Sequence, residues 1–429
     1  MSELDKVKSI YFIGIGGAGM SSLAAMMLAQ KKNVVGSEKE LNAITEELSS
    51  RGAKVFSDQS GEHVPDDVDL VVYTVAIPES NEDLKRARQL GVPVLSYPEM
   101  LGLISKNMIT IAVSGTHGKT TTTAMLAHVL EGTAISPTVL MGSAIADHKI
   151  NFIEGAGKYL LVEACEYRKS FLNLSPTYLI ITNVDEDHLD FYKDLADIQR
   201  AFKDLVAKIP EEGFVICGAK NSHLIPVVDG ATCAVIDYDG VLPETVKLLV
   251  PGTHNKENAA AVFALALKLG VDQKIIIEKL QSFKGVKRRF EFRGKTAEGA
   301  LVYDDYAHNH QKVAAALQGA REVYPGRKII AVFQPHLYSR TKTLLKSFGQ
   351  SFGNADSVLI APIYAAREPF DSSISSEILA NEIKKSGVLA EPFNSIDEVK
   401  NKLKTTLAEG DILMVLGAGD IIKLSDSLL

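Results

Sequence analysis

The length and charge of the chain exclude several classes of protein. With 429 residues, it is longer than a single hydrophobic core usually supports, and we expect two or three domains. A net charge of −7 argues against a general nucleic-acid binder, which would carry a basic surface. No long apolar run or signal peptide occurs, so we expect no membrane insertion. Its three cysteines lack metal-ligand spacing and are typical of reduced thiols in a cytoplasmic protein.

Short apolar runs alternate with helical patterns along the chain, which predicts an α/β protein with parallel sheets. In a first block we expect strands at 9–13, 34–36, 70–73 and 92–95 and a helix at 20–30. In a second block we expect strands at 108–113, 159–162 and 178–181 and a helix at 258–269. In a third block we expect parallel strands at 300–303, 328–333, 357–361 and 411–416. Three α/β domains in this order are therefore predicted.

The strongest local signal lies between the strand predicted at 108–113 and the helix that follows it. It contains Gly115, Thr116, His117, Gly118, Lys119, Thr120 and Thr121. Glycines at such a turn let backbone N–H groups face phosphate oxygens, Lys119 supplies a positive charge, and the Thr120 hydroxyl can bind Mg²⁺. Val113 stands where the strict P-loop pattern has its first glycine. The alternative is a glycine-rich turn with a solvated lysine, but Gly-Lys-Thr in this context favours an ATP site.

A second glycine-rich turn follows the first predicted strand and gives a weaker signal. It contains Gly14, Gly16, Gly17, Ala18, Gly19 and Met20. Such a turn can bind a pyrophosphate at the start of a helix, and Glu38 stands where dinucleotide enzymes hold a ribose. Alone, this segment would indicate a nicotinamide-dependent oxidoreductase. The ATP-type loop instead favours a nucleotide-linked substrate in the first domain and ATP in the second.

Acidic residues follow two strands of the second block. Glu163 comes at the end of the strand predicted at 159–162, the usual place for a Mg²⁺ ligand beside an ATP loop. The segment 183–190 adds four acids and His188 after another strand. Both segments are compatible with a metal site or with solvated loops, and spacing does not identify the ligand.

Further polar clusters stand at helix starts and strand ends. Asn255 opens an alanine-rich helix and could simply be its N-cap. Arg289 belongs to a basic pair near a domain boundary, where it could reach a phosphate or form part of a charged surface. Asp305 and His308 follow one strand of the third block, and the segment 334–340 follows the next. Two polar clusters at adjacent strand ends predict a binding crevice.

Taken in order, these segments resemble the Mur ligase family over nearly the whole chain. The motifs that carry the resemblance are GIGGAGM, GTHGKTTT, EACEYR, TNVDEDH, HNxxNA, RRFE and DDYAH. Within the family they are most similar to the members that add L-alanine to UDP-N-acetylmuramate. The fold that this implies has a Rossmann-like N-terminal domain (1–104), a P-loop ATPase-like central domain (105–290) and a Rossmann-like C-terminal domain (291–429).

The resemblance also implies roles for individual residues. The glycine turn at 14–20 would face the pyrophosphate of the UDP-sugar. Thr120 and Glu163 would hold one Mg²⁺ and His188 a second, and Lys119 would contact the γ-phosphate of ATP. The remaining implied ATP-site residues are Asn255, Asn258, Arg289 and Asp305. His308, His336 and Arg340 are candidates for the amino-acid pocket, in a C-terminal domain that closes over the site.

Some positions depart from the family pattern and keep alternatives open. The segment 308–311, Leu337 and the segment 73–77 are atypical, which concerns the identity of the amino acid rather than the ATP site. Lys203 lies where some members carry a carbamylated, metal-bridging lysine. The rival functions are a recycling ligase that attaches a peptide to the same sugar acid, an oxidoreductase, and a non-catalytic sensor. We expect a cytoplasmic monomer or homodimer.

Overall fold

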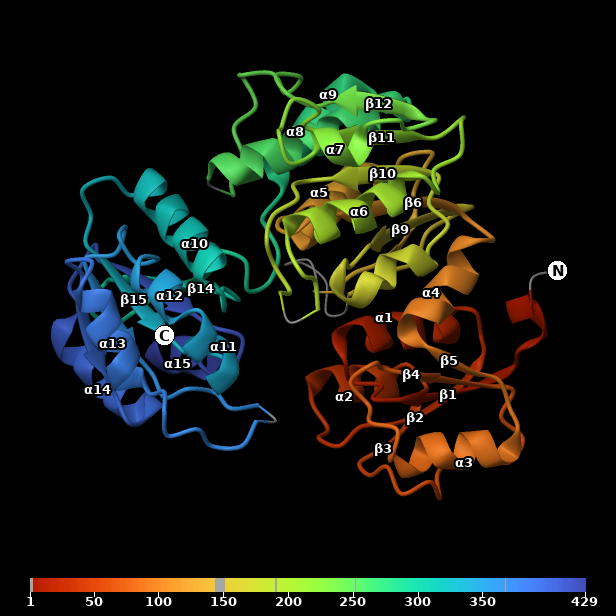
Figure 1. Cartoon of the computed structure of the whole chain (residues 1–429), viewed down its shortest axis with the longest axis horizontal. Coiled ribbons are helices and arrows are strands. Elements are labelled where there is room, and N and C mark those ends of the chain that lie inside the picture. The colour runs from red at the N-terminus through yellow and green to blue at the C-terminus, as the bar shows by residue number, and fades with distance from the viewer. Residues whose placement is uncertain (1–2, 143–150, 190, 251, 367) are drawn as a thin grey trace. The chain divides into compact units, whose positions relative to one another are not determined.

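The computed structural model describes residues 3–142, 151–189, 191–250, 252–366 and 368–429. The chain forms two compact units, one of residues 1–249 with 254–284 and the other of residues 250–253 with 285–429. The first unit contains two sheets and the second unit contains one (Figure 1). Among the described helices, none combines the length and apolar composition needed to cross a bilayer.

The first sheet is fully parallel, with strand order β3-β2-β1-β4-β5. Its strands are β1 (Ser9–Ile13), β2 (Asn33–Ser37), β3 (Lys54–Phe56), β4 (Leu70–Tyr73) and β5 (Val94–Ser96). Its helices are η1 (Glu3–Lys6), α1 (Ala18–Ala29), α2 (Ala43–Ser50), α3 (Glu82–Leu90) and α4 (Tyr97–Ser105). Alternate residues of β1 bury Phe12 against α1 and α4 and Tyr11 against α3, so helices cover both faces (Figure 1).

The second sheet has strand order β12-β11-β10-β6-β9-β7-β8. Its strands are β6 (Ile109–Ser114), β7 (Thr138–Leu140), β8 (Phe152–Ile153), β9 (Tyr159–Glu163), β10 (Tyr178–Ile181), β11 (Phe214–Cys217) and β12 (Ala234–Asp237). Its helices are α5 (Lys119–Leu130), η2 (Tyr167–Asn173), α6 (Leu195–Val206), α7 (Ile225–Val228), α8 (Thr253–Lys268) and α9 (Gln273–Ser282). All pairs are parallel except β7 with β8. The carboxyl ends of β6, β9 and β10 therefore meet at one edge.

The third sheet has strand order β13-β14-β18-β15-β16-β17. Its strands are β13 (Glu291–Lys295), β14 (Leu301–Asp305), β15 (Ile329–Phe333), β16 (Ser357–Ile360), β17 (Leu389–Pro392) and β18 (Ile412–Leu416). Its helices are α10 (His310–Val323), α11 (Tyr338–Thr343), α12 (Leu345–Gly349), α13 (Ser376–Lys384), α14 (Ile396–Thr406) and α15 (Ile422–Leu428).

The prediction of three α/β domains is confirmed, and the four strands predicted for the third sheet run parallel to one another. One strand that was not predicted is antiparallel, however, and one expected neighbour relation is wrong. Strand β13 is antiparallel to β14, because the short turn from Thr296 to Ala300 can only join antiparallel strands. Strands β14 and β15 are not neighbours, because β18 from the end of the chain inserts between them. Such insertion depends on long-range pairing that the order of strands in the sequence does not reveal.

Candidate active site

The loop between β6 and α5 has a backbone that only glycine adopts easily. Gly115 has φ 137° and Gly118 has φ 81°. A Cβ on Gly115 would lie 2.0 Å from Thr182 Oγ1, and one on Gly118 would lie 2.6 Å from Asn258 Oδ1. Both the backbone conformation and the available space therefore exclude larger residues, and the loop packs closely against β10 and α8.

The loop is tied to the segment that follows β10. Asn183 accepts from the N–H of Thr116 at 3.0 Å through its carbonyl and from the N–H of His117 at 2.8 Å through its side chain. Thr182 Oγ1 donates to the carbonyl of His117 at 2.5 Å. Sequence reasoning gave no role to Thr182 or Asn183, although both open the motif TNVDEDH.

Helix α5 supplies the free backbone donors of the loop. Its first intrahelical bond runs from Thr122 N to Gly118 O, so the N–H groups of Lys119, Thr120 and Thr121 have no intrahelical acceptor. These groups and the positive end of the helix dipole suit a phosphate. The predicted phosphate-binding residues at the start of the helix are therefore well placed, whereas the N–H groups of Thr116 and His117 already bind Asn183.

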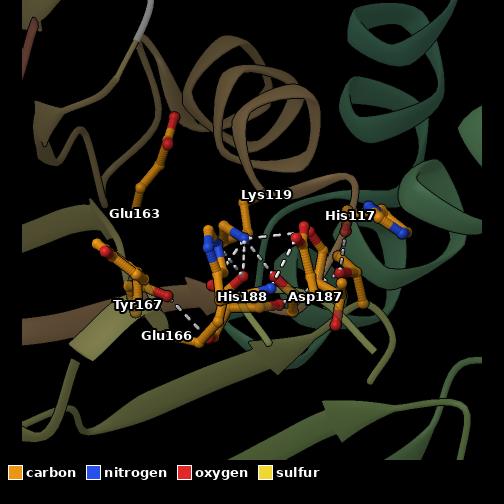
Figure 2. Close-up of polar contacts among 12 residues, drawn as sticks. His117, Lys119, Glu163, Glu166, Tyr167, Asp187 and His188 are labelled. Carbon is orange, nitrogen blue, oxygen red and sulfur yellow. Dashed lines mark hydrogen bonds and ion pairs between the residues drawn. The ribbon is translucent and has the colours of Figure 1, made fainter. Parts of the chain in front are cut away.

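The ammonium of Lys119 is held by protein oxygens. It lies 2.8 Å from Glu166 Oε2 and donates to the carbonyls of Gly115 and Thr116. Burial disfavours its charge, but the carboxylate of Glu166 outweighs that effect, and the pKa of Lys119 is raised. Lys119 is therefore a fixed cation at the start of α5. Figure 2 shows Lys119, Glu166 and His188 pointing toward one another.

Glu166 is a site residue that sequence reasoning missed. Its side chain is 3% exposed and lies 3.7 Å from His188 Nε2 as well as beside Lys119. Its carbonyl accepts from the Tyr192 hydroxyl at 2.5 Å. The motif EACEYR contains both Glu163 and Glu166, but spacing does not tell which carboxylate faces the lysine.

His188 has a backbone conformation that is costly for a non-glycine residue. Its φ is 56°, and its ring lies 4.7 Å from that of Tyr167. An observed left-handed residue of this kind is held by its surroundings and is common at functional sites. Asp190, the last acid of this segment, lies outside the described residues.

The geometry around Glu163 suits one divalent cation. Thr120 Oγ1 lies 3.3 Å from Glu163 Oε2, and Gly142 N donates to Glu163 Oε1 at 3.2 Å. No cluster of three His, Cys, Asp or Glu side chains capable of holding a metal occurs in the described parts of the chain. A hydroxyl and one carboxylate fit Mg²⁺, which usually takes its other ligands from water and from substrate phosphates.

Helix α8 places two buried amides behind the ATP-type loop. Asn258 Nδ2 donates to Asn255 Oδ1 at 3.2 Å, and Asn258 Oδ1 faces Gly118. Since α8 begins at Thr253, Asn255 is inside the helix, and the alternative that it is the N-cap is wrong. The sequence predicted the start of this helix at residue 258, five residues after its true start at Thr253, because polar residues fill the first turn of α8.

The first glycine turn also has a defined geometry. Gly14 has φ 80°, and the N–H of Gly16 donates to Glu38 Oε2 at 2.9 Å. Gly17 is the N-cap of α1, so the N–H groups of Ala18, Gly19 and Met20 have no intrahelical acceptor. Because Glu38 binds the turn itself, its position gives little support to ribose binding and to the oxidoreductase alternative.

In the second unit, Arg289 and Asp305 lie close to one short segment. The Arg289 guanidinium is 5.4 Å from the ring of Tyr306, and Asp305 Oδ2 accepts from Phe290 N at 2.8 Å. The neighbouring Asp304 pairs with Arg288 at 3.0 Å. Burial raises the pKa of Asp304 to about 6, although Arg288 opposes this. Both predicted residues therefore contact the end of β14 or belong to it: Arg289 contacts Tyr306, which follows β14, and Asp305 is the last residue of β14.

His308, His336 and Arg340 belong to one basic cluster of the second unit. The His308 and His336 rings lie 6.1 Å apart, although β18 separates their strands. His308 Nδ1 lies 2.8 Å from the carbonyl of Tyr306, which only accepts, so this nitrogen carries the proton. Burial, together with the charges of Lys312, Arg340 and Arg289, lowers the pKa of His308 to about 3. A neutral histidine surrounded by cations suits an anionic ligand.

Stability should depend on the pH through His308. Because its pKa is about 3 when folded and 6.5 ordinarily, the unfolded chain binds the proton more tightly. The part of the unfolding free energy that comes from neutral His308 is complete above pH 6.5 and is lost as the pH falls toward 3. Between pH 6.5 and 4, the unfolding free energy should fall by about 3 kcal/mol from this group. Urea unfolding of wild type and His308→Gln across this range checks it. The variant should lack this fall, whereas His223→Gln, at a half-exposed histidine, should retain it.

Lys203 is exposed and stands in the last turn of α6, whereas the segment that carries His188 precedes the first turn of that helix. The role of Lys203 as a carbamylated metal bridge stays a prediction.

Three α/β sheets and an ATP-type loop with a carboxylate at the neighbouring strand end indicate a nucleotide-dependent enzyme. Three domains of one protein family match successive parts of the chain. They are described as "Mur ligase family, catalytic domain" at residues 9–108, "Mur ligase middle domain" at 113–241 and "Mur ligase, glutamate ligase domain" at 288–419. The chain belongs to the Mur ligase family.

Curated relatives share most of their length with this chain. The UDP-N-acetylmuramate–L-alanine ligase of Clostridium kluyveri is 38% identical, with 98% of each chain covered. The protein of the same name from Clostridium novyi is 39% identical over 99% of this chain and 98% of the relative.

Solved structures agree with the fold. A UDP-N-acetylmuramate–alanine ligase from Thermotoga maritima has a TM-score of 0.82 and 31% identity, with 98% of each chain covered. A murein peptide ligase from Psychrobacter arcticus has a TM-score of 0.72 and 24% identity, with 98% of each chain covered. The second likeness concerns the fold alone.

Proposed function

We propose that this chain joins L-alanine to the carboxylate of UDP-N-acetylmuramate with hydrolysis of ATP, a step of peptidoglycan precursor synthesis. The observation that carries the proposal is the ATP-type loop, in which Lys119 and Thr120 lie beside Glu166 and Glu163. Support for the substrates comes from the full-length similarity to relatives named UDP-N-acetylmuramate–L-alanine ligase. A reaction that consumes ATP and a nucleotide-activated sugar is expected in the cytoplasm.

ATP would bind with its phosphates at the start of α5. The free N–H groups of Lys119, Thr120 and Thr121 would receive phosphate oxygens, and the ammonium of Lys119 would exchange part of its contact with Glu166 for the γ-phosphate. Thr120 and Glu163 would hold a Mg²⁺, which neutralises charge on the transferred group. Asn255 and Asn258 would lie near the nucleotide, because they back the loop at Gly118.

The UDP-sugar would bind at the first glycine turn. The free N–H groups of Ala18, Gly19 and Met20 at the start of α1 suit its pyrophosphate. The contact between Glu38 and Gly16 holds the turn in place and keeps one further N–H from the ligand. The sugar carboxylate would then receive the γ-phosphoryl group.

The chemistry explains why both sites are needed. A carboxylate is a poor acyl donor, and phosphoryl transfer converts it into an acyl phosphate with a good leaving group. The amine of the amino acid attacks the acyl carbon, a tetrahedral intermediate forms, and phosphate leaves as the amide is made. Lys119 stabilises negative charge on the transferring phosphoryl group.

The basic cluster of the second unit would receive the amino acid. Arg340 and Lys312 lie close enough to His308 to depress its pKa, and a carboxylate would balance their charge. His336 would contribute an aromatic surface, since its ring stacks on that of Tyr364 at 5.7 Å. Leu337 has φ 72° at the start of α11, so this atypical residue is held in a special conformation next to His336.

The choice of amino acid is tested by phosphate release. Purified chain would be given ATP, Mg²⁺ and UDP-N-acetylmuramate with L-alanine, glycine, L-serine or a tripeptide in parallel. We expect the largest kcat/KM with L-alanine and product formation in step with phosphate release. The main competitors differ by one methyl or hydroxyl group, so discrimination of about 10- to 200-fold is expected. Release only with the tripeptide would assign the chain to peptide recycling, and release with no acceptor would contradict the proposal.

A further inference from the structure

Asn151 joins the two sheets of the first unit through a buried amide. It is 4% exposed and precedes β8. Its Nδ2 donates to the carbonyls of Ala18 and of Met141, the latter at 2.8 Å, and its Oδ1 accepts from Ser21 Oγ at 3.2 Å. Ala18 and Ser21 belong to α1, and Met141 follows β7. One side chain therefore ties the start of α1 to the central sheet.

The chemistry of this contact specifies an amide. Both carbonyls can only accept, so the NH₂ group must face them and the orientation of the side chain is fixed. An aspartate at this position would direct a carboxylate oxygen at two carbonyl oxygens. Alanine would leave the carbonyl of Met141 without this donor in a buried place, whereas the Ser21 hydroxyl and the carbonyl of Ala18 would keep their hydrogen bond to each other at 2.9 Å.

The same contact continues to the proposed Mg²⁺ ligand. Met141 N donates back to the Asn151 carbonyl at 3.1 Å, which makes the link between Asn151 and Met141 double. The next residue, Gly142, donates from its N–H to Glu163 Oε1 at 3.2 Å, and Glu163 Oε2 faces Thr120 Oγ1 at 3.3 Å. An unbroken path of hydrogen bonds and one peptide unit thus runs from the UDP-sugar turn to the ATP loop.

A second contact supports the same coupling independently. Tyr97 is the first residue of α4, and a Cβ on Gly19 would lie 2.5 Å from its ring. Burial and the nearby carboxylate of Glu163 raise the pKa of Tyr97. Tyr97 therefore packs against the turn at Gly19 and lies within electrostatic range of the proposed metal ligand, so displacement of α1 would also move Tyr97.

We propose that Asn151 is a positioning residue that couples occupation of the glycine turn at 14–20 to the placement of Glu163 for Mg²⁺ and ATP. A ligand at the start of α1 fixes Ala18 and Ser21, Asn151 transmits this to Met141 and Gly142, and Gly142 holds Glu163 in its ligating orientation. The inference rests on the proposed function, because it assigns the UDP-sugar to the first turn and ATP to the second.

The coupling is measured by binding, without turnover. The Kd of a non-hydrolysable ATP analogue with Mg²⁺ would be determined by calorimetry, with and without saturating UDP-N-acetylmuramate. In wild type, the sugar nucleotide should tighten analogue binding by about 5-fold or more. In Asn151→Ala the ratio of the two Kd values should fall to near one. In Ser21→Ala, which removes one of the three side-chain contacts, it should fall part of the way.

The matched control is Asn81→Ala. Asn81 is also a buried amide of the first unit, where it caps α3 and donates to Gln59 at 2.9 Å, but it contacts neither glycine loop in these bonds. Asn81→Ala should lower the melting temperature but leave the ratio of the two Kd values at its wild-type value, because its effect is on stability alone. A ratio near one in wild type, or a wild-type ratio in both Asn151→Ala and Ser21→Ala, would overturn the inference. If Asn151→Ala does not fold, the ratio of Kd values measured for Ser21→Ala tests the inference.

The two proposals fail separately. Ligation of L-alanine by wild type without any effect of the sugar nucleotide on analogue binding would refute the coupling and leave the function. Coupled binding without ligation for any amino acid would refute the function and leave the coupling.

Discussion

Replacing Lys119 by alanine should abolish ligation, with kcat/KM lowered by at least about 10³-fold, as for the loss of a group that stabilises the charge of a transferring phosphoryl. The ammonium lies at the start of α5, 2.8 Å from Glu166. It is the side chain that the γ-phosphate would meet. Phosphate release in the presence of ATP, Mg²⁺, UDP-N-acetylmuramate and L-alanine measures the loss.

A double variant separates lost catalysis from local misfolding. Lys119→Ala leaves Glu166, which is 3% exposed, without its cationic partner, and an unpaired buried charge is destabilising. Lys119→Ala with Glu166→Gln removes both charges. We expect the double variant to regain thermal stability and to remain inactive. Recovery of ligation in it would show that Lys119 acts only on the fold, and Lys208→Ala, at an exposed lysine, should be as active as wild type.

Replacing Glu163 by glutamine should change the requirement for Mg²⁺. Glu163 faces Thr120 Oγ1 at 3.3 Å, and the amide keeps its size but loses the charge that binds the cation. The Mg²⁺ concentration for half-maximal activity should rise by at least about tenfold, the scale of losses when a metal site loses an anionic partner, and excess Mg²⁺ should restore part of the activity. Initial rates over a Mg²⁺ series check this.

Two comparisons make the Glu163 result specific. Glu154→Gln changes an exposed glutamate between β8 and β9, and its initial rate should equal that of wild type at every Mg²⁺ concentration. Glu166→Gln should lower activity through Lys119 while changing the Mg²⁺ requirement less than Glu163→Gln does. If Glu166→Gln shifts the Mg²⁺ series and Glu163→Gln does not, the ligand assignment is wrong.

The amino-acid sequence by itself determined the local elements of both glycine turns. An apolar run, glycines and then a helical pattern predicted β6 and α5 around residues 115–121, and β1 and α1 around residues 14–20. These patterns are readable because strand, turn and helix are contiguous and their periodicities differ. The alternation of such units also predicted three α/β domains, and the resemblance to Mur ligases followed from the motifs at their ends.

Only the tertiary structure decided which side chains meet. Glu163 and Glu166 are three residues apart, yet one faces Thr120 and the other faces Lys119, because β9 ends between them. Sequence reasoning chose the first and missed the second. Glu38 resembled a ribose ligand but binds the backbone of Gly16.

Long-range pairing accounts for the remaining differences. Strand β18 inserts between β14 and β15, and Asn151 contacts Ala18 although more than a hundred residues separate them. No periodicity or motif encodes such contacts, because they arise when buried polar groups must find partners in the packed core. The sequence therefore determined where the two glycine turns lie, and the fold decided which carboxylates and amides contact them.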